Sequence, residues 1–297
     1  MTVAVHEVAE GVYAYEQAPG GWCVSNAGIV VGGDGALVID TLSTIPRARQ
    51  LAETVDKLAG GPGRTLVNTH FHGDHAFGNQ VFPPGTPIIA HEDMRTAMVA
   101  TGLALTGLWP RTDWGEIEVT PPTVTFRDRL TVHVGERRAE LLCVGPAHTG
   151  HDVVVWLPEE RVLFAGDIVM SGVTPFVLFG SVAGTLAALD RLAELEPEVV
   201  VGGHGPVAGP EVLDANRAYL RWVQDLAAEA ADSGLTPLEA AGEADLGAFA
   251  GLLDAERLVA NLHRAHEELS GSPRRDAMEI FAELVAHNGG RLPTCLA

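Results

Sequence analysis

Short apolar runs separated by turn residues fill the first part of the chain. Glycine, proline or aspartate bounds each of these runs, which predicts strands at 11–15, 22–26, 27–31, 36–40, 65–68 and 88–91. Between them, Thr44 precedes a stretch with Leu51, Val55 and Leu58 at helical spacing, and Gly60 follows. This pattern predicts one amphipathic helix among the strands.

The alternation of strands and helices continues to residue 209. Paired strands are predicted at 123–134 and 137–144, a hairpin at 153–157 and 161–165, a helix at 181–196 and a strand at 198–201. Residues 92–101 predict a helix. The apolar stretch at 102–115 is broken by glycine and proline, so it fits either the core or the wall of a pocket.

From Pro210 onward the pattern becomes helical. Apolar positions recur at helical spacing over 210–231, 254–270 and 273–288. Thr236, Pro237 and Glu239 have the arrangement of a capping box with proline at the first helical position, which predicts a further helix start. The sequence therefore predicts an α/β body of residues 1–209 and a helical portion of residues 210–297 packed on it.

Charge and composition narrow the classes of function. The 297 residues are 46% hydrophobic and carry a formal net charge of −20 at pH 7, which argues against a nucleic-acid partner because phosphate backbones require basic surface. The sequence predicts no membrane segment and no signal peptide. The cysteines, Cys23, Cys143 and Cys295, are odd in number and far apart, so we expect no disulfide framework and a cytoplasmic location.

A cluster of metal-binding side chains follows the predicted strand at 65–68. His70, His72, Asp74 and His75 lie within six residues. In an extended segment His70 and His72 point the same way, and Gly73 allows a tight turn that aims the next two side chains at a second point. Imidazoles combined with carboxylates suit zinc, and also iron or manganese.

Further candidate ligands occur downstream, each shortly after a predicted strand. They are His148, Asp167 and His204, and each lies beside glycine or proline, where a loop can expose a side chain at the edge of a sheet. A lone histidine in such a place is usually structural. Seven potential ligands at strand ends are what a site for two metal ions needs.

This combination of ligands resembles the metallo-β-lactamase superfamily over roughly residues 8–209. The resemblance implies a four-layer αβ/βα sandwich and two Zn²⁺ ions, with Fe or Mn as alternatives. It implies that His70, His72 and His148 bind the first ion, that Asp74, His75 and His204 bind the second, and that Asp167 bridges them. Asp74 and Asp167 are the implied catalytic residues. With an aspartate at the bridging position, the chain resembles the glyoxalase II-like branch, whose members often hydrolyse thioesters. True β-lactamases do not place an aspartate there.

One position departs from that pattern. His151 stands where the superfamily often has glycine, and it is a candidate for a pocket residue, a partner of a ligand or a solvent-facing histidine. We leave it out of the metal set. Asp152 is a candidate acceptor for the N–H of a ligand imidazole.

A narrower resemblance concerns residues 13–23, 67–79, 103–111 and 171–176. These stretches resemble the second-ring cyclases of actinorhodin-type aromatic polyketide pathways. The resemblance implies a polyketide bound to an acyl carrier protein, closure of its second ring and release of the bicyclic product by thioester hydrolysis. We expect Trp109, Phe176 and Phe179 to bind the substrate, and a local basic patch with Arg111 or Arg274–Arg275 to receive the carrier.

The same ligands are compatible with other functions, because ligands determine the metal and not the substrate. The alternatives are a glyoxalase II-like thioesterase without cyclisation, a lactonase or phosphodiesterase, and a scaffold that has lost activity. A nuclease would be expected to carry an added domain and a basic surface. The sequence leaves open the metal, the ketone that is attacked and the oligomeric state.

Overall fold

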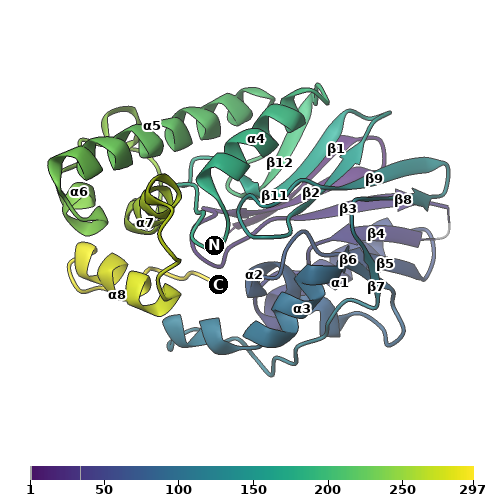
Figure 1. The fold of residues 1–297 in the computed structure, drawn as a ribbon. Coiled ribbons are helices and arrows are strands. Elements are labelled where there is room, and N and C mark those ends of the chain that lie inside the picture. The colour runs from purple at the N-terminus through teal and green to yellow at the C-terminus, as the bar shows by residue number, and fades with distance from the viewer. Residues whose placement is uncertain (1, 34) are drawn as a thin grey trace.

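Two β-sheets face each other in the computed structural model, which describes residues 2–33 and 35–297 (Figure 1). The seven-stranded sheet runs in the order β1 (Thr2–Ala9), β2 (Val12–Ala18), β3 (Ala27–Gly32), β4 (Gly35–Ile39), β5 (Gly63–Val67), β6 (Ile88–His91) and β7 (Val124–Phe126). The five-stranded sheet runs in the order β12 (Val199–His204), β11 (Val162–Met170), β10 (Val153–Leu157), β9 (Arg137–Cys143) and β8 (Arg129–Val134).

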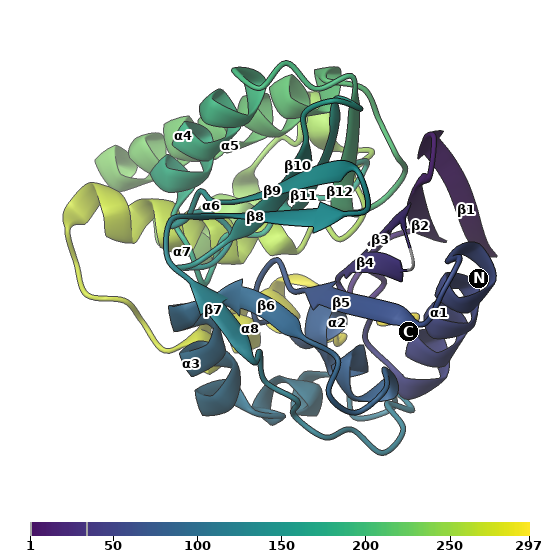
Figure 2. The same ribbon diagram turned by 90° about the vertical axis from the view of Figure 1, so that its right-hand side faces the viewer.

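Helices cover the outer faces of both sheets (Figure 2). The first sheet carries α1 (Ile45–Leu58), α2 (Gly73–Ala76) and α3 (Glu92–Thr101), with the short 3₁₀ helices η1 (Phe77–Val81) and η2 (Ala104–Leu108). The second sheet carries α4 (Val182–Ala193) and α5 (Glu211–Ser233). The four layers confirm the predicted αβ/βα sandwich.

The remaining helices lie at one end of the sandwich, on the left in Figure 1. They are α6 (Pro237–Glu243), η3 (Gly247–Phe249), α7 (Arg257–Ser270) and α8 (Ala277–His287). Thr236 and Glu239 form the predicted capping box at the start of α6. Val169 of β11, Leu220 of α5 and Leu262 of α7 belong to one buried apolar cluster, so the C-terminal helices share a core with the second sheet.

A second buried cluster joins the two sheets. Val30 and Leu37 of the first sheet pack there with Leu141 and Val155 of the second, and all four side chains are fully buried. These residues come from the apolar runs that predicted the strands, because alternate side chains of a strand face the same side.

The direction of the strands decides where the loops meet. β4, β5 and β6 are parallel neighbours in the first sheet, and β11 and β12 are parallel in the second. The carboxyl ends of parallel strands share one edge of a sheet. The loops after β5, β9 and β12 and the end of β11 therefore come together at one edge of the sandwich.

Two predictions about strands are wrong, and one strand was missed. Residues 22–26 form turns and not a strand, and Cys23 adopts φ 61°. The predicted strand at 123–134 divides into β7 and β8, which belong to different sheets, so this segment is the crossover between them. β1 was not predicted, because it is an edge strand with mostly exposed side chains and its pairing with β2 determines it.

Among the described helices, none combines the length and the hydrophobicity that crossing a bilayer requires.

Candidate metal centre

The loop between β5 and α2 brings the first ligands to the edge of the sandwich. Asn68 is followed by the predicted cluster, and the N–H of His75 donates to the carbonyl of His72 at 3.1 Å, so the chain turns sharply there. Gly73 lies at this turn, and a Cβ atom on it would meet the ring of Phe77 at 2.2 Å. A larger residue at position 73 would therefore displace either the turn or that ring.

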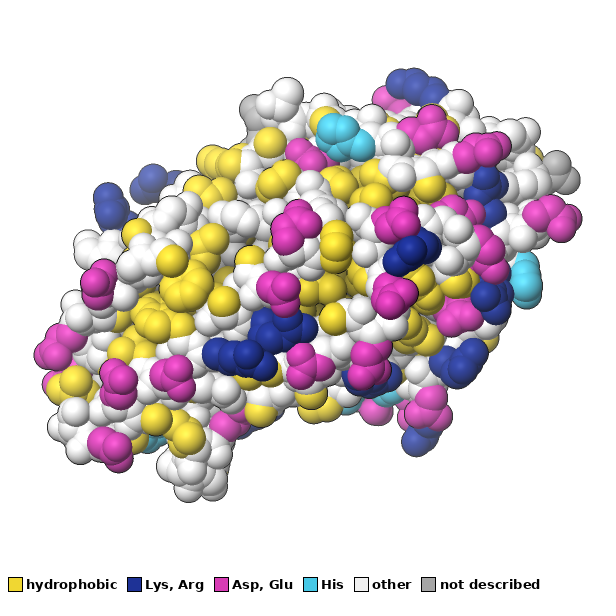
Figure 3. Space-filling model, turned by 90° about the horizontal axis from the view of Figure 1, so that it is seen from above, with side chains coloured by type: hydrophobic (Ala, Val, Ile, Leu, Met, Phe, Trp, Pro, Cys, Tyr) yellow, Lys and Arg dark blue, Asp and Glu magenta, His cyan; other side chains and the backbone are white. Residues whose placement is uncertain are grey.

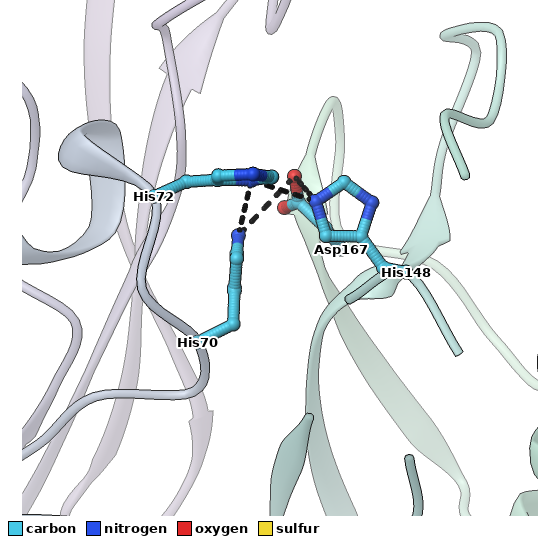
Figure 4. Close-up of side chains that lie close together, drawn as sticks. All are labelled: His70, His72, His148 and Asp167. Atoms are coloured by element: carbon cyan, nitrogen blue, oxygen red, sulfur yellow. Dashed lines mark hydrogen bonds and ion pairs between the residues drawn. The ribbon is translucent and has the colours of Figure 1, made fainter. Parts of the chain in front are cut away.

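Four of the predicted ligands converge on one point (Figure 4). His72 Nδ1 lies 3.1 Å from His70 Nε2 and 2.9 Å from His148 Nε2. Asp167 Oδ2 lies 3.4 Å from His148 Nε2 and 3.8 Å from His70 Nε2. His70 and His72 come from the first sheet, and His148 and Asp167 approach from the second.

The other predicted ligands form a second group on the far side of Asp167. Asp74 Oδ2 lies 3.3 Å from His204 Nε2 and 3.7 Å from His75 Nε2. Asp167 Oδ1 lies 3.1 Å from His75 Nε2, and Asp167 Oδ2 lies 3.4 Å from His204 Nε2. The carboxylate of Asp167 thus faces both groups. The structure brings together all seven residues, although their role as metal ligands stays a prediction.

The polar atoms of this cluster fit a pair of cations. His75 Nε2 and Asp167 Oδ1 are buried, and neither has a hydrogen-bond partner among the residues that the structure describes, although they are 3.1 Å apart. Buried polar atoms without partners are costly unless another group satisfies them. Three imidazole nitrogens with a carboxylate, beside two imidazole nitrogens with a carboxylate, are donor sets that zinc, iron and manganese accept.

Room for the Asp167 carboxylate comes from the neighbouring strand. A Cβ atom on Gly203 of β12 would lie 1.9 Å from Asp167 Oδ1. Any side chain at position 203 would collide with the carboxylate. Glycine is thus required there for close approach of β12 to Asp167.

Asp40 orients ligands in both groups, and the sequence analysis missed it. Its Oδ2 accepts from His75 Nδ1 at 2.7 Å and from the hydroxyl of Thr69 at 2.8 Å, and that hydroxyl in turn accepts from His70 Nδ1 at 3.0 Å. These bonds place the protons of both imidazoles on Nδ1 and leave Nε2 free to bind a cation. The one signal in the sequence is an aspartate directly after the strand that neighbours β5.

Backbone carbonyls do the same for two other ligands. His148 Nδ1 donates to the carbonyl of Phe176. His204 Nδ1 lies 3.0 Å from the carbonyl of Gly20 and 3.1 Å from that of Val24. In each case Nδ1 carries the proton, and Nε2 faces the cluster.

The expectation for Asp152 is wrong. Its carboxylate accepts from the N–H of Ala147 at 3.1 Å, from the N–H of Thr149 at 2.9 Å and from the hydroxyl of Thr149 at 2.7 Å. Asp152 therefore holds the loop that carries His148 and does not bind the imidazole, whose N–H goes to Phe176.

Electrostatics divide four histidines of the cluster into two pairs, His70 with His72 and His75 with His204. Burial holds the pKa of His70 well below its usual value and lowers that of His72 to about 3. Burial acts in the same direction on His75 and His204, but the facing carboxylates, above all Asp167, outweigh it. They hold the pKa of His75 well above its usual value and raise that of His204 to about 9.

A pocket opens onto the cluster, and its empty space of about 600 Å³ includes the solvent at its open mouth. His72, Asp74, His148, Asp167 and His204 form its polar base. Half of its wall residues are aromatic, and the predicted substrate residues Trp109, Phe176 and Phe179 all lie in the wall, although substrate binding by these residues stays a prediction. Leu105, Leu108, Trp109 and Trp114 line it too, so part of the 102–115 stretch is pocket wall.

Other residues of the wall were not predicted to bind substrate. Trp22 and Trp114 are, by their sequence context, more typical of core, and Arg257 and Phe281 come from the C-terminal portion. The sequence contains no signal for Arg257 and Phe281, because helices α7 and α8, which are distant in the chain, place them in the wall.

His151 lies apart from the seven ligands. Its ring stacks on His91 at 5.2 Å between centroids and 1° between planes, and its Nδ1 is 3.8 Å from Asp93. Its side chain is 35% exposed. His151, His91 and Asp93 offer ligand atoms within 4.8 Å of one another, so they form a separate potential cation group. Leaving His151 out of the seven-residue metal set stays a prediction.

Comparison with protein families matches residues 20–204 to the metallo-beta-lactamase superfamily, and this range includes all seven clustered side chains. The chain belongs to the metallo-beta-lactamase superfamily. Within it, the chain is similar to solved structures in fold. A metallo-beta-lactamase from Pontibacter korlensis matches with a TM-score of 0.59 at 24% identity, covering 74% of this chain and 99% of the other. The DIM-1 metallo-beta-lactamase gives the same TM-score at 19% identity, covering 74% and 97%.

Sequence relatives in the superfamily have diverse names. A linear primary-alkylsulfatase from a Pseudomonas strain is 27% identical over 69% of this chain and 47% of its own length. The alpha subunit of a 2,4-dinitroanisole O-demethylase from a Nocardioides strain is 29% identical over 59% and 51%. A type 2 metallo-beta-lactamase from Bacteroides fragilis is 24% identical over 71% and 83%. The chain spans about half the length of the first two relatives.

Proposed function

We propose that this protein is a metal-dependent cyclase of aromatic polyketide biosynthesis. It closes the second ring of a polyketide held on an acyl carrier protein and releases the bicyclic product by thioester hydrolysis. Membership of the metallo-beta-lactamase superfamily supports the hydrolytic half of this proposal. The narrower resemblance to second-ring cyclases supports the other half.

The observation that carries the proposal is the aromatic wall above the metal centre. The ring centroid of Trp22 lies 5.6 Å from that of Trp109 and 5.1 Å from that of Phe176, and Phe176 lies 6.2 Å from Phe179. The rings meet at tilted or edge-to-face angles, and such aromatic walls can hold a planar, partly aromatic substrate and exclude water from it. A chain that must fold back on itself to close a ring needs such a wall, because orientation removes much of the entropic barrier.

The polar base supplies the chemistry. Two divalent cations, for which zinc is the first candidate, would provide Lewis acidity toward the substrate oxygens and lower the pKa of water. His70, His72 and His148 would hold one, Asp74, His75 and His204 the other, and Asp167 both. Burial would raise the pKa of Asp74, but His75 and His204 outweigh it and hold that pKa well below its usual value. The ionised Asp74 lies in the base of the cavity, where its carboxylate would help to hold the second ion beside the substrate.

The carrier requires a surface beside the cavity. Arg274 donates to the carbonyls of Phe179 at 3.2 Å and Gly180 at 2.8 Å, which fixes this cation beside the pocket wall. Acidic and basic side chains are interspersed with hydrophobic ones on the face drawn in Figure 3. In a chain of net charge −20, a local patch with Arg274 or Arg111 is where we propose that the acidic carrier docks.

A second candidate is an ester hydrolase without cyclisation. The 27% identity to a protein named an alkylsulfatase favours it, because both chains would then cleave an ester next to a long apolar group. The cavity suits this role too, since its walls are apolar.

Product analysis separates these functions. The substrate is a polyketide with its first ring closed, loaded on its carrier protein, and the products are identified by mass spectrometry with untreated and chelator-treated protein. We expect a free bicyclic acid that the chelator abolishes. A free acid without the second ring would support the hydrolase, and an intact thioester after incubation with the metal-loaded protein would overturn both functions.

A further inference from the structure

Helix α7 and the residues just before it contact two loops, and the backbone carbonyls of these loops orient His148 and His204. The first is the loop at 173–177, whose Phe176 carbonyl accepts from His148 Nδ1. The second is the loop at 20–24, whose Gly20 and Val24 carbonyls accept from His204 Nδ1. Both loops also supply the aromatic wall, through Phe176 and Trp22.

Asn261 of α7 clamps the first loop on both sides of Phe176. Its Nδ2 donates to the carbonyl of Pro175 at 2.7 Å, and its Oδ1 accepts from the N–H of Val177 at 3.0 Å. The side chain is fully buried, and Nδ2 also donates to the hydroxyl of Tyr219 at 3.1 Å. One side chain from the C-terminal portion therefore fixes both peptide units of Phe176, including the unit that contains its carbonyl.

Asp254, just before α7, holds the second loop. Its Oδ2 accepts from the N–H of Trp22 at 3.0 Å, and the indole of Trp22 donates to Glu256 at 2.8 Å. Arg257 completes the contact, because its guanidinium lies 4.1 Å above the Trp22 ring and 3.1 Å from Asp254 Oδ2. Trp22 lies between the two residues whose carbonyls bind His204.

We propose that Asn261 and Asp254 are positioning residues for the two metal subsites, Asn261 for the ion at His148 and Asp254 for the ion at His204. Each acts through the backbone carbonyl that fixes the proton and the ring orientation of one histidine. The inference rests on the two-metal site of the proposed function, but not on the choice of substrate.

The test measures each subsite separately in the full-length chain. Zinc is titrated into metal-free protein by calorimetry, and the variants His148→Ala and His204→Ala identify which binding step belongs to which subsite. We expect Asn261→Ala to weaken the His148 subsite roughly 10- to 100-fold, as removal of such partners typically does, and to leave the other within about twofold. Asp254→Gly should do the reverse, since glycine tolerates the φ of 57° at this position.

Two further variants guard against a general loss of stability. Tyr219→Phe removes the third partner of Asn261 but leaves the loop contacts, so it should lower the melting temperature and leave both zinc affinities unchanged. Asn261→Ser is a milder change that replaces Asn261→Ala if the latter does not fold. Equal weakening of both subsites by each variant, or unchanged affinities in folded variants, would overturn the inference. Absence of zinc binding by the unmodified chain would instead overturn the proposed function.

Discussion

At the scale of residues, the orientation of four histidines is determined by what accepts from Nδ1, the ring nitrogen that points away from the cluster. His75 uses Asp40, His70 uses the Thr69 hydroxyl, and His148 and His204 use backbone carbonyls. That these side chains would lie together could be predicted, because imidazoles and carboxylates at strand ends leave a pattern in the sequence. The acceptors could not, because any residue can supply a carbonyl and because Asp40 resembles an ordinary strand-ending aspartate.

The role of Asp40 gives a prediction for Asp40→Asn. Asparagine tolerates the φ of 60° at this position, so the backbone stays as it is. An amide NH₂ in place of Oδ2 cannot accept from His75 and Thr69. We expect zinc affinity at the His75 subsite to fall roughly 10- to 100-fold. The free energy of unfolding should fall by roughly 1–3 kcal/mol, because buried donors are left without an acceptor.

Thr69→Val is the matched comparison, because it removes only the link between Asp40 and His70. It should weaken the subsite of His70 and spare that of His75. Zinc titration and chemical denaturation of both variants check this. An Asp40→Asn protein with the stability and both zinc affinities of the unmodified chain would show that Asp40 does not orient these ligands.

At the scale of elements, strand direction and loop position determine which side chains meet. Parallel pairing of β4 with β5 and of β11 with β12 brings Asp40, His70, Asp167 and His204 to one edge. The sequence predicted these strands from their apolar runs, but it did not show that residues 22–26 form a turn. That turn exists because Asp254, Glu256 and Arg257 hold Trp22, and these contacts join residues more than 230 positions apart.

The 102–115 segment can be tested by Trp109→Ala. Trp109 packs against Trp22 at 5.6 Å and Trp114 at 6.4 Å between centroids and forms part of the cavity wall. Removing the ring should raise KM for the carrier-bound polyketide roughly 10- to 100-fold, because the substrate then buries less apolar surface against the wall. It should also increase the share of product released without the second ring, because the substrate is less restrained.

Steady-state kinetics with product analysis measures both effects. Zinc content serves as the control and should not change, because Trp109 contacts none of the acceptors that orient the ligands among the described hydrogen bonds. Unchanged KM and product ratio would remove Trp109 from the substrate pocket.

At the scale of the whole molecule, the C-terminal helices are part of the same core as the second sheet. One buried cluster includes Leu163 of β11, Val223 of α5 and Leu258 of α7. The αβ/βα sandwich could be predicted from periodicity and the ligand pattern together. The contribution of α7 to the metal centre and the cavity could not, because helical periodicity shows which face is apolar but not what that face covers.

The whole-molecule claim is that seven side chains from two sheets hold two divalent ions. Calorimetric titration of zinc into the metal-free chain tests it most directly, in buffers of different ionisation enthalpy so that released protons are counted. Carboxylates hold the pKa of His75 well above its usual value and raise that of His204 to about 9, so both environments favour the protonated ring in the metal-free chain, and metal binding competes with protons there.

The account predicts two zinc ions bound per chain, release of protons at pH 7 from those rings, and an affinity that rises with pH until His204 is deprotonated. His70 and His72, whose pKa values burial lowers, should release none. Binding of one ion only, or no saturable binding, would contradict the account.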